Sequence, residues 1–217
     1  MCANLRSSLD CCGKAVMRTS AFVAAFSVAA GPALAHHVMG GTMPVSFMDG
    51  LLSGLGHPVI GLDHLAAVIA VGCLAAGQRR GALAVVGYVV ATAVGAAAHI
   101  GEATVAGAEI FVALSVIALG LVLLRAGSLR ADIVFALFAF AGLVNGYALG
   151  ESIAGAEPKP IYGYFIGLVL VQSGIALLAM AAVPVLTARK PLVGRLIGGA
   201  IAGIGLCVLA LQVVATT

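Results

Sequence analysis

Residues 161–183 read IYGYFIGLVLVQSGIALLAMAAV, a run with no charged side chain. An α-helix rises about 1.5 Å per residue, so a run of this length crosses the roughly 30 Å of a bilayer core. A helix that is apolar on every side has no face to offer water. The stretch therefore predicts a membrane-spanning helix and, with it, an all-α membrane protein.

Five other stretches have the same character, and Gly-, Pro- or Arg-containing segments separate them. The expected spans, besides 161–183, are 58–77, 81–101, 107–126, 130–150 and 193–215. Each has about the twenty residues that a bilayer core requires. The preceding apolar stretch 45–56 is too short to cross, and we expect it to lie at the interface or to enter as a half-helix. The pattern predicts a polytopic bundle of six transmembrane helices.

The composition excludes several classes of protein. Of the 217 residues, 62% are hydrophobic and 9% are charged, whereas a soluble domain is nearer half apolar and a quarter charged. The net charge of +3 is too small and too scattered for a nucleic-acid-binding surface. A soluble enzyme, a nucleic-acid binder and a disordered chain are therefore excluded.

Glycine is abundant in the sequence. The residues Gly87, Ala91, Gly95 and His99 are spaced by four, which predicts a stripe of small residues, ending in an imidazole, on which another helix packs closely.

The N-terminal residues 1–35 resemble a secretory signal peptide. Met17-Arg18 is a basic start, 21–30 is an apolar run, and Ala33-Leu34-Ala35 is a small-x-small cleavage pattern. We expect cleavage after Ala35 and a single mature domain over 36–217. Residues 1–16 fit a signal poorly, so Met17 is the expected true start.

Charge predicts the orientation of the spans. With the mature N-terminus outside, the cytoplasmic regions carry seven basic residues and the outer regions carry Lys159 alone. This is the positive-inside pattern. It predicts a bacterial inner-membrane protein with both mature termini in the periplasm. The seven residues are Arg79, Arg80, Arg125, Arg130, Arg189, Lys190 and Arg195.

Polar side chains within the expected spans lie toward their outer ends. Burying such groups in a bilayer is costly, so they usually have a function. In the first span, His57 and His64 are two helical turns apart and share a face. Pro58 favours a helix start at that point and leaves His57 on a bend, from which His57, Asp63 and His64 could converge on one ion. The residues of this expected cation vestibule are His57, Asp63, His64, His99, Glu109 and Asn145.

Imidazole and carboxylate ligands together suit nickel, cobalt, copper or zinc, and they suit magnesium and calcium poorly. His36 and His37, at the expected mature N-terminus, would add an external capture point. Because neutral imidazole is the ligand form, metal binding should weaken as the pH falls through about 6.5. The sequence therefore predicts a divalent transition-metal site.

Other roles stay open for most of these residues. His57 and His99 lie near helix ends, where an imidazole can simply bond a carbonyl group. Glu109 also fits a carboxylate that favours a helix N-terminus, and His36-His37 fits a loosely constrained stretch after a cleavage site. Asp63 beside His64 inside a span is best explained by function.

The segment HPVIGLDHLA, residues 57–66, resembles the signature of the HupE/UreJ family, His-Pro-x-x-Gly-x-Asp-His followed by an apolar helix. Glu109 with Ser115 and Gly120, and the stretch 146–157, are similar to further family patterns. The resemblance implies a six-span nickel or cobalt permease of the kind encoded with hydrogenase or urease genes. It implies metal roles for His57, Asp63 and His64, and a further one for Glu109.

The resemblance has one departure, at Asn145, where the family often has a histidine. An amide oxygen is a weaker, neutral ligand. The contribution of this span to metal binding, and the choice among metals, are therefore open.

The function expected from the sequence is secondary uptake of nickel or cobalt for metalloenzyme maturation. No nucleotide-binding loop is present, and no His-Glu-x-x-His helix or paired nucleophile indicates an enzyme. The metal is expected as a transported substrate, and no prosthetic group is expected. The expected partners are the metal and the lipid bilayer, with homo-oligomers and metalloenzyme maturation proteins left open. The alternatives are an accessory protein that presents metal to a partner, and an intramembrane hydrolase with a His/Asp-bound metal.

Overall fold

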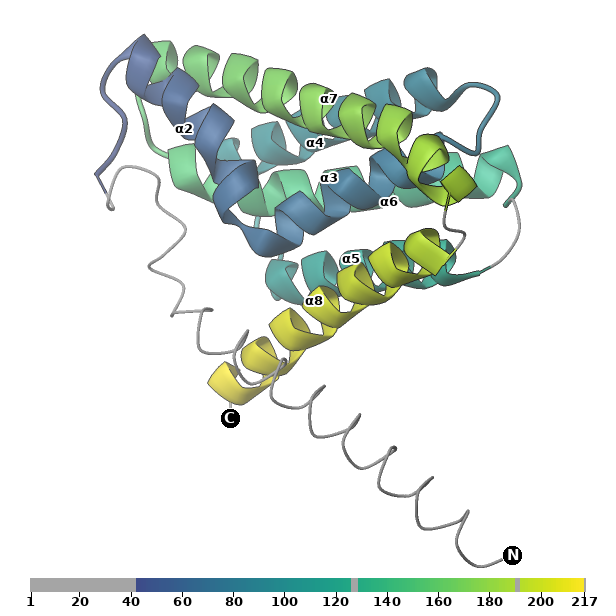
Figure 1. Cartoon of the computed structure of the whole chain (residues 1–217). Coiled ribbons are helices and arrows are strands. Elements are labelled where there is room, and N and C mark those ends of the chain that lie inside the picture. The colour runs from purple at the N-terminus through teal and green to yellow at the C-terminus, as the bar shows by residue number, and fades with distance from the viewer. Residues whose placement is uncertain (1–41, 126–128, 190–191, 217) are drawn as a thin grey trace, which may run out of the picture. The chain divides into compact units, whose positions relative to one another are not determined.

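The computed structural model describes residues 42–125, 129–189 and 192–216, and throughout these ranges the chain forms helices and their connections, with no strand. The expected signal peptide, Met17, His36 and His37 lie outside the described residues. The all-helical prediction is confirmed (Figure 1). The helices are α2 (Phe47–Ile60), α3 (Leu62–Ala75), α4 (Gly81–Ile100), α5 (Ala108–Leu124), α6 (Ala131–Gly150), the short η2 (Glu151–Ile153), α7 (Pro158–Arg189) and α8 (Leu192–Thr216).

Within the described residues, four helices are long and apolar enough to cross a membrane, namely α4, α6 with η2, α7 and α8. The bent pair of α2 and α3 counts as a fifth if it forms one span. Helix α5 is apolar but has only 17 residues. The protein is therefore a membrane protein with four or five such helices, and the sixth expected span is not confirmed.

The outer surface of the bundle is hydrocarbon. On α4, Leu83, Val86, Val90 and Val94 are 53% to 56% exposed. Their spacing of three or four residues places them on one face of the helix. A continuous apolar stripe of this kind is suited to lipid and would be poorly tolerated in water.

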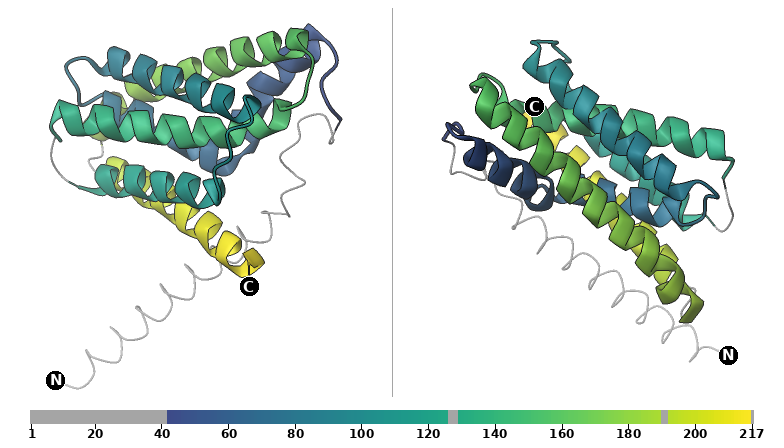
Figure 2. Two further views of the ribbon diagram at one scale, coloured as in Figure 1. Left: turned by 180° about the vertical axis from the view of Figure 1, so that it is seen from behind. Right: turned by 90° about the horizontal axis from the view of Figure 1, so that it is seen from above.

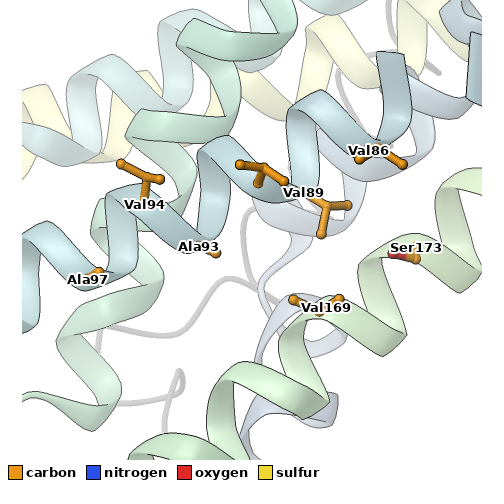
Figure 3. Close-up of a pocket in the computed structure, with 8 residues that line it drawn as sticks. Val86, Val89, Ala93, Val94, Ala97, Val169 and Ser173 are labelled. Carbon is orange, nitrogen blue, oxygen red and sulfur yellow. The ribbon is translucent and has the colours of Figure 1, made fainter. Parts of the chain in front are cut away.

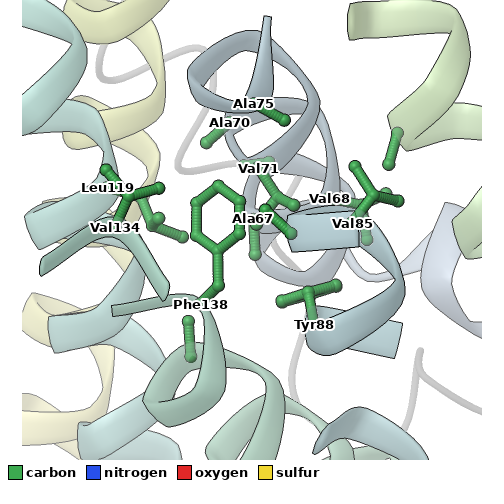
Figure 4. Close-up of a cluster of buried hydrophobic side chains, with 14 of the residues drawn as sticks. Ala67, Val68, Ala70, Val71, Ala75, Val85, Tyr88, Leu119, Val134 and Phe138 are labelled. Atoms are coloured by element: carbon green, nitrogen blue, oxygen red, sulfur yellow. The ribbon is translucent and has the colours of Figure 1, made fainter. Parts of the chain in front are cut away.

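Helix α3 lies in the middle of the bundle, with α7 and α4 on one side and α5 and α8 on the other (Figure 1). It also contacts α2 and α6. Its residues are apolar in every direction after the first turn, as a helix with neighbours on all sides requires. Figure 4 shows the Phe138 ring of α6 between Leu119 and Val134 on one side and Ala67 and Val71 of α3 on the other.

Three helix pairs pack at very short range, because glycines allow their backbones to approach. A Cβ atom added to Gly146 of α6 would overlap the Thr92 carbonyl oxygen of α4. Glycines play the same part between α2 and α7 and between α5 and α8. Close backbone approach is the main source of helix association in a bilayer. The glycines of the other two pairs are Gly54 and Gly163, and Gly120 and Gly198.

The small-residue stripe expected on α4 is confirmed over most of its length. Ala91, Gly95 and His99 face the glycines or backbone of α6, and the two helices run side by side (Figure 2). The expectation is wrong at Gly87, where an added Cβ would meet nothing within 4 Å. The stripe therefore begins one turn later than expected.

The helix break lies at Gly61 and not at Pro58. The stretch 45–56 is largely helical, and α2 continues through Pro58 to Ile60. The chain then bends by 80° into α3. Proline lacks the N–H of one helical bond, but its fixed φ fits a helix. Gly61 has an extended backbone (φ −71°, ψ 106°), its N–H still donates to the His57 carbonyl at 3.1 Å, and its carbonyl accepts from Leu65 N–H at 2.9 Å.

Candidate functional site

The bend at Gly61 gathers the three polar residues of the HPVIGLDH segment. His57 lies in the last turn of α2, and Asp63 and His64 open α3. Each of the three is only 5% exposed. The planes of the two imidazole rings make an angle of 58°, and the ring centroids are 6.2 Å apart. The bend therefore brings two imidazoles and a carboxylate into the interior of the bundle.

The electrostatics of the bend favour a cation. The Asp63 side chain accepts the His64 N–H at 2.9 Å and occupies the first turn of α3, where the helix dipole stabilises a carboxylate. The carbonyl end of α2 points at the same bend and carries partial negative charge. Helices α2 to α6 contain no Lys or Arg. The cationic groups that these helices can supply are therefore imidazoles alone.

Two other helices contribute neutral polar groups to the same site. His64 Nδ1 lies 2.9 Å from Asn145 Oδ1 on α6. Asn145 Nδ2 donates to Ser115 Oγ on α5 at 3.0 Å and to the Ala141 carbonyl at 2.8 Å. Ser115 Oγ in turn donates to the Val112 carbonyl at 2.7 Å. Ser115 and Asn145 have no exposed surface, so a continuous hydrogen-bonded chain links α3, α6 and α5.

The structure does not bring His99 to this cluster. The His99 ring packs on Tyr147, with centroids 4.5 Å apart. Tyr147 follows Asn145 by two residues on α6, and two residues turn a helix by about 200°. His99 and His64 therefore meet nearly opposite faces of α6. The Tyr147 hydroxyl donates to the Ala103 carbonyl at 2.6 Å and accepts from Val105 N–H at 2.9 Å, which anchors the α4–α5 connection.

Glu109 lies at the beginning of α5, on the same helix as Ser115. It is half-buried in the first turn of α5. Ser115, which joins the His64 chain, is six residues further on, about 9 Å along the helix axis. Glu109 occupies a position where the helix dipole favours a carboxylate.

The cluster lies deeper in the bundle than the sequence pattern indicates. The pattern predicts His57, Asp63 and His64 at the outer end of a span that begins at Pro58. Instead, helical turns of α2 precede the bend, and Asn145 links His64 to Ser115, the eighth residue of the 17-residue helix α5. Because α2 packs along α7, the chain enters the bundle before the polar segment begins. Ion sites at a break between two half-helices are a recurring feature of transporters.

Among the residues that the structure describes, no group of three or more His, Cys, Asp and Glu side chains is arranged to hold a metal ion. His57, Asp63 and His64 are neighbours, but they are not a ready three-ligand set in this conformation. Their convergence on one ion remains a prediction. It would require a side-chain movement or further oxygen ligands.

The HupE / UreJ protein family model matches residues 24–208. The chain belongs to the HupE/UreJ family. No curated protein and no solved structure matches the chain.

Membership confirms the resemblance that the HPVIGLDH segment carries. In this HupE/UreJ protein, the segment is where the chain bends between α2 and α3. Asn145, the departure from the family pattern, is the residue that bonds His64. The structure therefore connects the departure directly to the signature segment.

Two buried polar residues escaped the sequence prediction of the site. In the sequence, Ser115 stands out only through its place in a stretch that resembles a family pattern. Gln172 has no exposed surface, and within the described residues its amide has no hydrogen-bond partner. A Cβ atom added to Gly54 of α2 would meet Tyr164 and Leu168 of α7. One helical turn further along both helices, Gln172 of α7 therefore lies opposite the end of α2. Gln172 could have been predicted from the sequence, because a polar side chain inside the uncharged run 161–183 is costly to bury in a bilayer.

A groove of about 420 Å³ between α4 and α7 is a different kind of surface (Figure 3). Seven of its eight lining residues are Val or Ala, and the eighth is Ser173. Hydrocarbon side chains cannot coordinate a metal ion. The groove is therefore not a metal site.

Gly61 should be essential for the arrangement at the bend. An added Cβ would lie 2.8 Å from His64 Cδ2 and 3.2 Å from Asp63 Oδ1. The backbone angles suit alanine, so the expected cost arises from displacement of the His64 ring. We expect Gly61→Ala to weaken metal binding by roughly tenfold or more, the effect of disturbing a ligand's orientation. Gly87→Ala is the matched control, and equal affinity in the two variants, measured by metal titration, would contradict the expectation.

Proposed function

We propose that this HupE/UreJ protein is a secondary carrier that takes up a divalent transition-metal ion, nickel or cobalt, across the bacterial inner membrane for maturation of hydrogenase- or urease-type enzymes. The ion would bind at the bend between α2 and α3. His57, Asp63 and His64 are the proposed ligands. His99, Glu109 and the external pair His36-His37 would act at other points along the route.

One observation carries the proposal. A buried carboxylate and two buried imidazoles lie together at a break between two half-helices, among helices α2 to α6 that contain no Lys or Arg. A carboxylate beside two imidazoles is the ligand mixture that a borderline divalent metal prefers.

The proposed topology has six spans after a cleaved signal peptide, with both mature termini in the periplasm. It counts the α2–α3 pair as one span and the 17-residue α5 as another. Helix α5 would cross about 26 Å at 1.5 Å per residue, slightly less than a typical core, and a small mismatch of this kind is accommodated by local thinning of the bilayer.

The membrane potential is a sufficient driving force. A divalent cation that crosses about 100 mV gains roughly 4.6 kcal/mol. At about 1.4 kcal/mol per factor of ten, this supports on the order of a thousandfold accumulation. ATP is therefore not required.

Transport would require the helices to move. After His64, the side chains along α3 are apolar, and Ala67 and Val71 pack against Phe138 (Figure 4). This apolar cluster separates the bend from the far end of α3. An ion could pass only in a second conformation, as alternating access around a fixed site provides.

The test is uptake of radioactive nickel into proteoliposomes that contain only this protein, with an inside-negative potential. Saturable uptake that cold cobalt competes away, and that zinc and copper affect in a measurable order, is the expected result. Empty liposomes and a collapsed potential are the controls. Absence of uptake in active, correctly inserted protein would overturn the carrier.

The second candidate is an accessory protein that binds metal and presents it to a partner. The apolar cluster beyond the bend favours it, because a presenting protein needs no route across the bundle. Metal binding at the bend without uptake in the same proteoliposomes would support this alternative.

A further inference from the structure

The orientation of the Asn145 amide follows from its partners. The Ala141 carbonyl can only accept a hydrogen bond, so the amide atom 2.8 Å from it is Nδ2. The same Nδ2 lies 3.0 Å from Ser115 Oγ, whose own hydrogen goes to the Val112 carbonyl. Ser115 therefore accepts from Asn145. Both amide hydrogens are used, and Oδ1 is the atom that faces His64.

The orientation of the amide determines which nitrogen of His64 holds a proton. Oδ1 is an acceptor, so His64 Nδ1, at 2.9 Å, must be the donor. In a neutral imidazole only one nitrogen is protonated. The lone pair of neutral His64 is therefore on Nε2.

We propose that Asn145 and Ser115 are positioning residues that hold His64 as its Nδ1–H tautomer and present Nε2 to the metal. This inference rests on the proposed metal-binding function. It assigns Asn145 a role that differs from the ligand role expected from the sequence, since an Oδ1 turned toward a metal would give up its bond to His64. Metal-binding histidines commonly donate their second ring N–H to such an acceptor.

Two features of the hydrogen-bonded chain hold His64 in this tautomer. All its members are buried, so water does not compete for His64 Nδ1. Each link also has its direction set by the next one, from His64 to Asn145, then Ser115, then the Val112 carbonyl. If the Asn145 amide flipped, Oδ1 would face the Ala141 carbonyl oxygen and Ser115 Oγ in place of Nδ2.

The first experiment reads the tautomer in the metal-free protein. The ¹⁵N NMR spectrum of histidine-labelled protein in nanodiscs, minus that of His64→Gln, isolates His64. We expect a protonated Nδ1 and an unprotonated Nε2 in the wild type at a pH where the ring is neutral. Asn145→Leu should shift His64 toward the Nε2–H form. An Nε2–H wild type, or a tautomer unchanged by Asn145→Leu, would overturn the proposal.

A milder variant guards against misfolding. Ser115→Ala removes one hydroxyl and leaves Asn145 in place, and we expect a partial loss of the Nδ1–H form. Ser115→Thr keeps the hydroxyl and should restore it. Thr92→Val is the matched control, because the Thr92 hydroxyl donates to the Tyr88 carbonyl outside this network. Equal tautomer populations in Ser115→Ala and the wild type would contradict the role of Ser115.

The second experiment separates positioning from ligation. Titration with Co²⁺, followed by visible absorption, reports both affinity and ligand set. We expect Asn145→Leu and Ser115→Ala to weaken binding about ten- to a hundredfold with unchanged band positions. Shifted bands in Asn145→Leu would show that Asn145 is a ligand and overturn the proposal. If the wild type binds no Co²⁺, the metal function fails, whereas the tautomer result stands by itself.

Discussion

Replacing His64 by alanine is expected to reduce metal uptake to the level of empty liposomes while the helix bundle still forms. The substitution removes the Nε2 lone pair and the donor that faces Asn145 Oδ1. Leaving one buried acceptor unsatisfied costs about 1–3 kcal/mol, which the other contacts of the central helix α3 should tolerate. Nickel uptake into proteoliposomes, with circular dichroism and gel filtration of the same preparation, measures both effects.

His99→Ala is the comparison variant. It also removes an imidazole, but one on α4 that packs against the opposite face of α6. We expect a much smaller loss of uptake than in His64→Ala. Should His64→Ala fail to insert, His64→Gln retains an amide donor for Asn145 and should also lose uptake. Wild-type uptake in a folded His64 variant would reject the site at the bend.

Replacing Gly146 by leucine is expected to prevent α4 and α6 from packing. A Cβ atom alone at this position would overlap the Thr92 carbonyl oxygen, and backbone cannot move aside as a flexible side chain can. Overpacking commonly costs about 1–3 kcal/mol and sometimes more. A leucine against backbone should lie at or beyond the upper end, so we expect a large loss of folded protein.

The measurement is the thermal midpoint and the monodisperse yield in detergent. Gly87→Leu is the matched control, because an added Cβ at Gly87 meets nothing within 4 Å. Gly146→Ala should fall between the two. A thermal midpoint for Gly146→Leu equal to that of Gly87→Leu would show that the pair does not require its close contact.

The positions of the long helices could be predicted closely from the sequence. The stretch 81–101 corresponds to Gly81–Ile100, and 130–150 corresponds to Ala131–Gly150. Apolar runs between breakers define such helices, because a bilayer offers the backbone no other hydrogen-bond partners. The predicted span 161–183 is shorter than the observed helix α7, Pro158–Arg189, because α7 continues through Pro184.

The break in the polar segment could not be located from local signals. Pro58 and Gly61 are both breakers, and Pro58 is the usual residue at a helix start. Helix α2 packs against α7 through Gly54 and Gly163 and continues past Pro58 to Ile60. Gly61 then becomes the point where the chain turns.

The sequence by itself determined that the protein is an α-helical membrane protein, and it singled out four of the polar residues that are buried in it. The cost of placing polar groups in hydrocarbon makes His57, Asp63, His64 and Asn145 conspicuous wherever they point. Only the tertiary structure decided that Asn145 meets His64, 81 residues away, and that His99 does not. Periodicity determines which residues share a face of one helix. The rotation of one helix against another depends on close contacts between distant glycines and backbone, and those contacts exist only in the folded bundle.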